Sequence, residues 1–202
     1  MSEESKRSPL RAVNAFTQEQ WSVMPPVNSS YPFNSREALS RVVCAGLATA
    51  IVDGLFSSIL VVAAYGSTFS RLFQGVASML AGSSAFTGGA RTTALGVLIH
   101  CGVAFGWSAL FVLVIMRSAW IRGVLASPYG AVKVASVYGP AIWLVMSLLV
   151  IPLLSRTSPA ISFRWLVQLI GHFPFVGIPI VVSATWGAPL SGSEAAPTKS
   201  EA

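Results

Sequence analysis

Four long apolar runs dominate the chain, at residues 42–64, 92–116, 134–154 and 165–186. The hydrocarbon core of a bilayer is about 30 Å thick, so a helix rising about 1.5 Å per residue needs about 20 apolar residues to cross it. Each run is long enough. The pattern therefore predicts an all-α polytopic membrane protein in which residues 42–186 form a domain of four transmembrane helices in a lipid bilayer.

A fifth apolar run, at residues 71–80, is too short to cross a membrane. Its apolar side chains recur with helical spacing and form a single stripe, made of Leu72, Phe73, Val76, Met79 and Leu80. This spacing predicts a short interfacial helix that lies in the outer surface of the membrane. The alternative is a surface loop that happens to be apolar.

The segments before and after the apolar runs are more polar. Residues 1–41 are expected to form a cytoplasmic N-terminal arm, in which Asn34 and Glu37 have the spacing of a capping box and predict a helix start. Residues 187–202 have the composition of a disordered cytoplasmic tail. The arm also contains large apolar residues interrupted by prolines, and we predict that these dock onto other membrane protein subunits: Phe16, Trp21, Met24, Tyr31 and Phe33. The alternatives are contact with a membrane surface and simple disorder.

Charge is sparse and scattered along the chain. Only 10% of residues are charged, against about a quarter in a typical soluble domain, so a soluble enzyme is not the default interpretation. The net charge of +6 comes from cations at the ends of apolar runs rather than on one basic face, which argues against nucleic acid as a partner.

The distribution of Lys and Arg predicts the orientation in the membrane. Nine lie in the terminal segments and the middle loop, and four lie in the other two loops. Cytoplasmic loops carry the excess of positive charge, so both termini are predicted to be cytoplasmic. The nine are Lys6, Arg7, Arg11, Arg36, Arg41, Arg117, Arg122, Lys133 and Lys199, and the four are Arg71, Arg91, Arg156 and Arg164.

Three ionisable residues lie within the apolar runs: Asp53 in the first, His100 in the second and His172 in the fourth. Because such residues are costly in lipid, each should face the protein interior and find a partner there. All three fall at similar depth, which predicts a buried polar cluster. It could be a proton relay or small-ion site, or it could only hold the helices together by hydrogen bonds. Metal binding is a third hypothesis, although the residues lack local ligand spacing.

Small residues predict where helices approach closely. In the first run Gly46, Ala50, Gly54 and Ser58 recur every four residues, and in the second Gly96 begins a similar row while Gly102 and Gly106 form a GxxxG pair. Packing inside the chain is the favoured explanation, and formation of a homo-oligomer is the alternative.

No enzyme signature is present in the sequence. We find no nucleophile elbow, phosphate-binding loop, dinucleotide fingerprint or zinc-protease motif, and Asp53 is the only acid between Glu37 and Glu194. The two cysteines have no disulfide or zinc spacing. The chain is therefore expected not to be an enzyme, and the sequence indicates no cofactor and no metal.

Several short motifs resemble those of a family of small uncharacterised bacterial four-helix inner-membrane proteins. The motifs are RLFQGVAS at 71–78, AFTGG at 85–89, ALGVLIH at 94–100, VIPLLS at 150–155, LIGH at 169–172 and GIP at 177–179. The resemblance spans about residues 42–186 and implies a bacterial inner membrane, without implying an activity. The chain departs from the pattern in its N-terminal arm and at Ser147, where an asparagine would be expected.

Two functions are compatible with these observations. The first is a non-enzymatic accessory subunit of a larger membrane complex, respiratory or photosynthetic, which the aromatic arm and the missing catalytic motifs favour. The second is a small oligomeric transporter or proton-coupled channel, which Asp53, His100 and His172 favour.

Overall fold

The computed structural model describes residues 33–159, 161–188 and 190, which belong to one structural unit of the chain. Four helical stretches in this part are long and apolar enough to cross a membrane: Ser35–Ala64, Gly89–Arg117, Gly130–Ser155 and Phe163–Thr185. They coincide with the four predicted runs, and the described residues include no strand. The all-α fold with four candidate membrane spans is confirmed.

Three of the four spans contain a π-helical segment. The first span is α2 (Ser35–Ile59) followed by the π-helical Leu60–Ala64, and the second is α4 (Gly89–Leu113) followed by a 3₁₀ turn, Ile115–Arg117. The third comprises α6 (Gly130–Val145), the π-helical Met146–Val150 and α7 (Ile151–Ser155), and the fourth comprises α8 (Phe163–His172), the π-helical Phe173–Gly177 and α9 (Ile178–Thr185). Two shorter helices, α3 (Phe69–Ala81) and α5 (Ala119–Ala126), connect spans.

The first span begins at the predicted capping box. The side chain of Asn34 accepts a hydrogen bond from the backbone N–H of Glu37 at 2.9 Å, and the Glu37 carboxylate accepts one from the backbone N–H of Asn34 at 3.3 Å. These bonds satisfy N–H groups that a helix start otherwise leaves unpaired. The helix therefore begins well before residue 42, where the apolar run starts.

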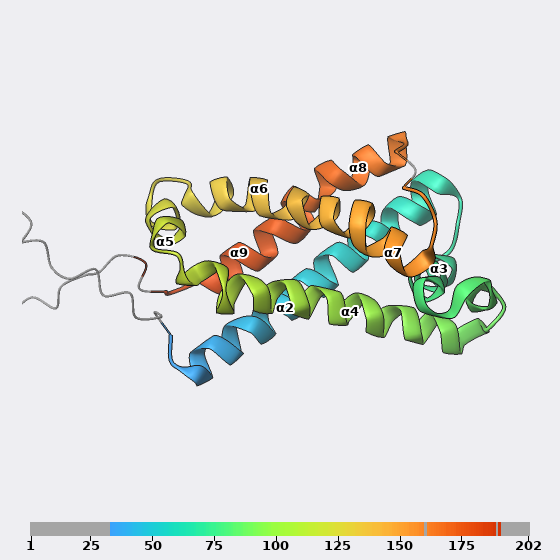
Figure 1. Ribbon diagram of the computed structural model, residues 1–202, viewed down its shortest axis with the longest axis horizontal. Helices are drawn as coiled ribbons and strands as arrows, with labels where there is room; N and C mark the ends of the chain where they lie inside the picture. Colours follow the sequence, from blue (N-terminus) through green and yellow to red (C-terminus); the bar gives the residue numbers. More distant parts are fainter. Residues whose placement is uncertain (1–32, 160, 189, 191–202) are drawn as a thin grey trace, which may run out of the picture. The chain divides into compact units, whose positions relative to one another are not determined.

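Consecutive spans run in opposite directions (Figure 1). The start of α2, the end of α9 and the short helix α5 lie at one end of the four helices, which we call the α5 end. There Arg41 Nη1 donates hydrogen bonds to the carbonyl oxygens of Ala184 and Trp186 at 2.8 and 2.9 Å. A cation at the C-terminus of α9 also interacts favourably with the helix dipole.

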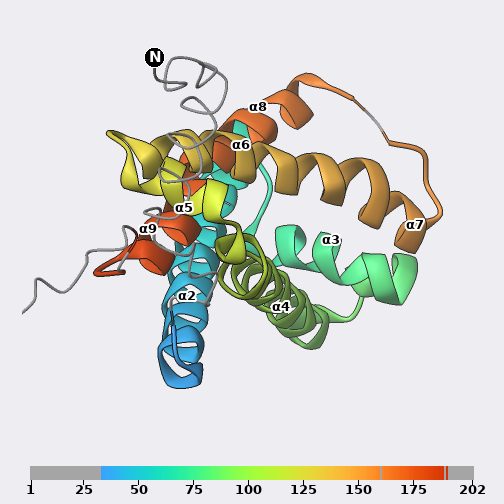
Figure 2. The ribbon, with the colours of Figure 1, turned by 60° about the vertical axis from the view of Figure 1, so that its left-hand side comes forward.

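The short helix α3 lies at the opposite end, which we call the α3 end. Figure 1 shows α3 nearly along its axis and Figure 2 shows it from the side, so it runs across the direction of the spans. Ser70 Oγ and Thr93 Oγ1 lie 2.6 Å apart, and Gln74 Nε2 donates to the carbonyl oxygen of Gly89 at 3.3 Å. Side-chain hydrogen bonds thus fix α3 to the start of α4.

The apolar stripe of α3 faces the bundle more than the lipid. Leu72, Phe73, Val76 and Met79 all line a cavity between the spans, whereas Leu80 is 63% exposed. The helix expected at residues 71–80 is present, but most of its apolar side chains cover the interior of the protein.

Glycines allow close contacts between helix backbones, although not at every predicted position. A Cβ atom on Gly96 would overlap the carbonyl oxygen of Phe73 on α3, and one on Gly46 would lie 2.6 Å from the ring of Phe105. On Gly102 and Gly106, however, a Cβ would meet nothing within 4 Å. Internal packing is therefore wrong for the GxxxG pair, because its two glycines face outward from α4.

A further glycine contact joins the third and fourth spans. A Cβ on Gly139 would overlap the carbonyl oxygen of His172, and one on Gly177 would overlap that of Ala135. These two glycines let the backbones of α6 and the π-helical Phe173–Gly177 touch, as small residues do in membrane proteins. The contact is close to His172 and fixes that residue against α6.

The hydrophobic core fills the half of the bundle toward the α5 end. Its fully buried large side chains are Phe111, Val112, Met116, Ile180 and Val181, each 0% exposed. Phe33 also packs into this core and is 6% exposed, with the Arg41 guanidinium 4.2 Å from its ring centroid. The docking role predicted for Phe33 is therefore wrong, whereas Phe16, Trp21, Met24 and Tyr31 lie outside the described residues.

We predict that Gly96→Val destabilises the protein strongly and that Gly102→Val on the same helix does not. Overpacking a tight contact costs about 1–3 kcal/mol or more, whereas the side chain at residue 102 enters open space. Thermal unfolding in mild detergent measures both variants. Equal melting temperatures for the two would contradict the α3–α4 contact.

Candidate functional site

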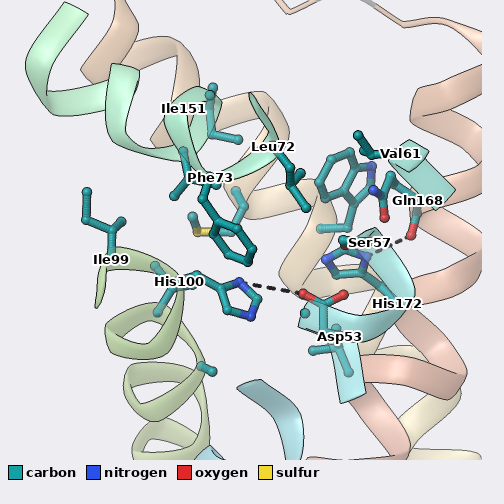
Figure 3. A pocket seen from close by; sticks show the side chains of 18 of the residues that line it. Asp53, Ser57, Val61, Leu72, Phe73, Ile99, His100, Ile151, Gln168 and His172 are labelled. Atoms are coloured by element: carbon teal, nitrogen blue, oxygen red, sulfur yellow. Dashed lines mark hydrogen bonds and ion pairs between the residues drawn. The ribbon is translucent and has the colours of Figure 1, made fainter. Parts of the chain in front are cut away.

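A cavity of about 630 Å³ occupies the half of the bundle toward the α3 end. Its walls are mostly apolar and come from all four spans and from α3. Thr49, Asp53 and Ser57, spaced one helical turn apart on α2, place one polar row along it. In the view of Figure 3, the carboxylate of Asp53 lies below the α3 residues Leu72 and Phe73.

The predicted polar cluster is present in this cavity. Asp53, His100 and His172 all line it, and the two imidazoles come from α4 and α8 on either side of the carboxylate (Figure 3). Asp53 Oδ2 lies 3.9 Å from His100 Nδ1, and the two side chains are 14% and 18% exposed. At this distance the two groups form an ion-pair contact that is too long for a hydrogen bond.

The hydrogen bonds of His100 define which of its nitrogens can take a proton. Its Nε2 lies 3.1 Å from the carbonyl oxygen of Ala50, and a carbonyl only accepts, so Nε2 carries a hydrogen and donates. In the neutral ring, Nδ1 then presents a lone pair toward Asp53. Two electron-rich atoms face each other unless one proton is shared between them, on the carboxyl group or on the imidazole.

His172 is held in a corresponding way on the other side. Its Nδ1 donates to the carbonyl oxygen of Gln168 at 2.7 Å, which leaves Nε2 as the nitrogen with a lone pair in the neutral ring. The Trp143 ring packs against it with 4.8 Å between ring centroids, and His172 is only 8% exposed. The cluster therefore has two imidazole nitrogens and one carboxylate that can exchange protons.

Four polar atoms at this cavity are buried without a hydrogen-bond partner: Thr49 Oγ1, Asp53 Oδ1, Trp143 Nε1 and Gln168 Oε1. More than about 90% of buried polar groups in proteins are hydrogen-bonded, because leaving one unpaired costs about 1–3 kcal/mol. Thr49 is buried, at 2% exposed, whereas Asp53, Trp143 and Gln168 are partly exposed.

The cluster does not have the geometry of a metal centre. Among the described residues, no group of three or more His, Cys, Asp and Glu side chains could hold a metal ion. The imidazoles of His100 and His172 and the carboxylate of Asp53 are groups that take part in proton exchange and hydrogen bonding.

Two arginines line the mouth of the cavity at the α3 end. The Arg71 guanidinium lies 4.5 Å from the centroid of the Phe86 ring, and the Arg164 guanidinium lies 3.9 Å from that of Tyr65. Both arginines and both rings belong to the cavity wall. Stacking on an aromatic ring holds a guanidinium in place while leaving its N–H groups free to donate.

Sequence reasoning missed part of this site. Gln168 received no role, and Trp143 was not linked to the cluster although its ring packs on His172. The row of Thr49, Asp53 and Ser57 on α2, in contrast, follows from their i, i+4, i+8 spacing in the sequence. No comparable signal identifies Gln168 or Trp143, because their positions depend on how α6 and α8 pack.

Comparison with protein-family models, with curated proteins and with solved structures finds no match to this chain.

We predict that water reaches Ser57 and not its neighbour Ser58, which does not line the cavity and donates its hydroxyl to the Gly54 carbonyl at 2.6 Å. In a background lacking Cys44 and Cys101, Ser57→Cys should react faster with a hydrophilic thiol reagent than Ser58→Cys. The reacting species is the thiolate, which forms in a hydrated site. Equal labelling rates would show that the cavity is not accessible from water.

Proposed function

We propose that the protein binds a small molecule in its cavity and moves it across a membrane together with a proton held by Asp53, His100 and His172. One observation carries the proposal: Asp53 lines a cavity of about 630 Å³ and lies between two imidazoles from other helices. This volume falls within the range of small-molecule sites, about 300–1,000 Å³.

The alternative, that the cluster only holds the helices together, predicts direct hydrogen bonds between them. Asp53 Oδ1 has no such bond, and the distance from Oδ2 to His100 is 3.9 Å. A polar residue kept only for packing would be more fully satisfied, because an unpaired buried polar group is destabilising. The incomplete pairing therefore supports a functional cluster.

Interrupted helices beside the cavity also support transport. The π-helical segments contribute Val61, Met146 and Val176 to its wall. Transporters often place their substrate sites beside discontinuous helices, and π-helical turns are frequent at functional sites. Pro152 and Pro174 lack the N–H that would continue the regular hydrogen-bond pattern, which accounts for two of the interruptions.

We further propose that the α5 end faces the cytoplasm of a bacterial inner membrane, so that the cavity mouth faces outward. The excess of Lys and Arg in the terminal segments and middle loop supports this orientation. The motif resemblance supports the choice of membrane. We propose that a chain of this size forms its pathway as an oligomer.

The accessory-subunit function stays a prediction. It rests on the N-terminal arm, and of its five proposed docking residues only Phe33 lies within the described part of the chain, where it is buried in the core. The cavity and its cluster favour the transport function, because an accessory role does not require either.

We predict that Asp53→Asn abolishes proton movement and leaves assembly intact, since asparagine keeps the size and removes the charge. Phosphatidylcholine vesicles holding a pH-sensitive dye are exposed to naphthalene derivatives with a neutral, a cationic or an anionic group. In vesicles that contain the wild-type protein, at least one of the three compounds should change the internal pH by more than it does in protein-free vesicles. Glu37→Gln is the control, because Glu37 lies at the α2 start and outside the cavity.

Two results would contradict the proposed function. One is an unchanged pH signal in Asp53→Asn, and the other is a wild-type signal equal to that of protein-free vesicles for all three compounds.

We also predict that reporter fusions after residues 85, 125, 160 and 202 alternate outside, inside, outside and inside. Each span reverses the direction of the chain, and the positive charge places the α5 end inside. Activity of an enzyme reporter that works on only one side of the membrane measures each position. An external residue 202 would reverse the proposed orientation.

A further inference from the structure

The two arginines at the cavity mouth differ from the other arginines at the α3 end. Arg71 and Arg164 line the cavity, whereas Arg91 and Arg156 do not. Each of the first two is held against an aromatic ring that also lines the cavity, Phe86 for Arg71 and Tyr65 for Arg164. An arginine that only extends into water or lipid headgroups would not need an aromatic ring to hold its guanidinium group in place.

Neither of these arginines has a carboxylate partner among the described residues, where the only ion pair within 4.0 Å joins His100 and Asp53. The acids in this part of the chain are Glu37 and Asp53. Glu37 is bound to Asn34 at the start of α2, and Asp53 lies between His100 and His172. The guanidinium N–H groups at the mouth are thus available to an anion.

The rest of the cavity wall is apolar and aromatic. This part of the wall includes Leu72, Phe73, Val76, Trp107 and Trp143. These side chains can pack against the apolar part of a ligand. A ligand that satisfies both parts carries one anionic group and one compact apolar group. A cationic ligand would have to pass two positive charges before it reached Asp53.

From this arrangement we infer that the cavity takes an amphipathic monoanion, whose charged group lies between Arg71 and Arg164 and whose apolar body extends toward Asp53. The inference rests on the proposed function of the cavity as a binding site and names its ligand class. The anionic group is a carboxylate, a sulfonate or a phosphate diester. It can belong to a free small molecule or to a lipid headgroup.

The same assignment gives the proton cluster a role. A monoanion that enters alone adds one negative charge to a low-dielectric interior, which is unfavourable. One proton taken up by Asp53, His100 or His172 offsets that charge. The loaded cavity then carries the same net charge as the unloaded one, so anion and proton move together in the same direction.

Binding of naphthalene-2-sulfonate to the protein in phosphatidylcholine nanodiscs tests the ligand class. Isothermal titration should show binding that is stronger than that of the neutral naphthalene-2-methanol or the cationic 2-naphthylmethylammonium, and that weakens as salt is raised. Arg71→Gln and Arg164→Gln should each weaken it about tenfold or more, because each removes a charge-assisted hydrogen bond. Arg91→Gln, at the same end and outside the cavity wall, should leave it unchanged.

Lysine variants keep the test valid if a glutamine variant misfolds. Arg71→Lys and Arg164→Lys retain the positive charge and should keep most of the sulfonate affinity. Nanodiscs that contain phosphatidylglycerol identify the source of the anion. A lower apparent sulfonate affinity there, lost in the glutamine variants, indicates a lipid headgroup, whereas an unchanged affinity indicates a free small anion.

Failure of this inference can be told apart from failure of the proposed function. Stronger binding of the neutral or cationic analogue than of the sulfonate would overturn the ligand class and leave the binding function standing. Equal weakening by Arg91→Gln would overturn the role of the mouth arginines. Absence of binding by all three compounds would overturn the proposed function together with the inference.

Discussion

The need to keep one carboxylate away from lipid governs the arrangement of this protein. An ionised group in the middle of an apolar span is unfavourable unless it faces polar partners, so the face of α2 that carries Asp53 must turn inward. The opposite face of the same helix carries Leu47, Ile51 and Leu55, which are 50–59% exposed and suited to lipid contact. Because Asp53 faces inward, the neighbouring helices α4 and α8 must supply polar partners for its carboxylate, and each supplies an imidazole. The first span is thereby surrounded on its polar side by the helices that carry His100 and His172.

Packing differs between the two halves of the bundle, and the difference defines where the cavity lies. Toward the α5 end, Phe111, Met116 and Ile180 are fully buried and fill the space between the spans. Toward the α3 end, the π-helical segments and the large rings of Phe73 and Trp143 surround space instead of filling it. Gly139 and Gly177 lie between these regions and bring two backbones into contact, which fixes the depth of His172. The cluster consequently lies where the solid core ends and the cavity begins.

The sequence predicted features that depend on local pattern and missed those that depend on how helices face one another. The four spans, the cap at Asn34 and the cluster at Asp53 follow from apolar length, residue spacing and the cost of burying charge. The same reasoning gave Gly102 and Gly106 a packing role inside the chain, but spacing does not say which face of α4 meets a neighbour. Phe33 was assigned to a partner because the large apolar residues of the proline-interrupted arm were not expected to have a core of their own. The structure instead packs Phe33, just before the start of α2 at Ser35, into the core of the bundle. The arginines at the mouth were used only to count charge, because their position over the cavity depends on where α3 and α8 lie.

The second span and α3 form the part of the cavity wall that is least able to change shape. The second span contains no π-helical segment within residues 89–117, and α3 is bound to it through Ser70, Gln74 and the close contact at Gly96. The first, third and fourth spans each change helix type beside the cavity, and two of these changes coincide with prolines that leave carbonyl groups without their regular partners. Such interruptions are where membrane helices bend most readily. Under the proposed transport function, access from the α5 end would be gained by movement of these three spans against the α3–α4 unit. Arg71 belongs to that unit, and Arg164 belongs to one of the three spans.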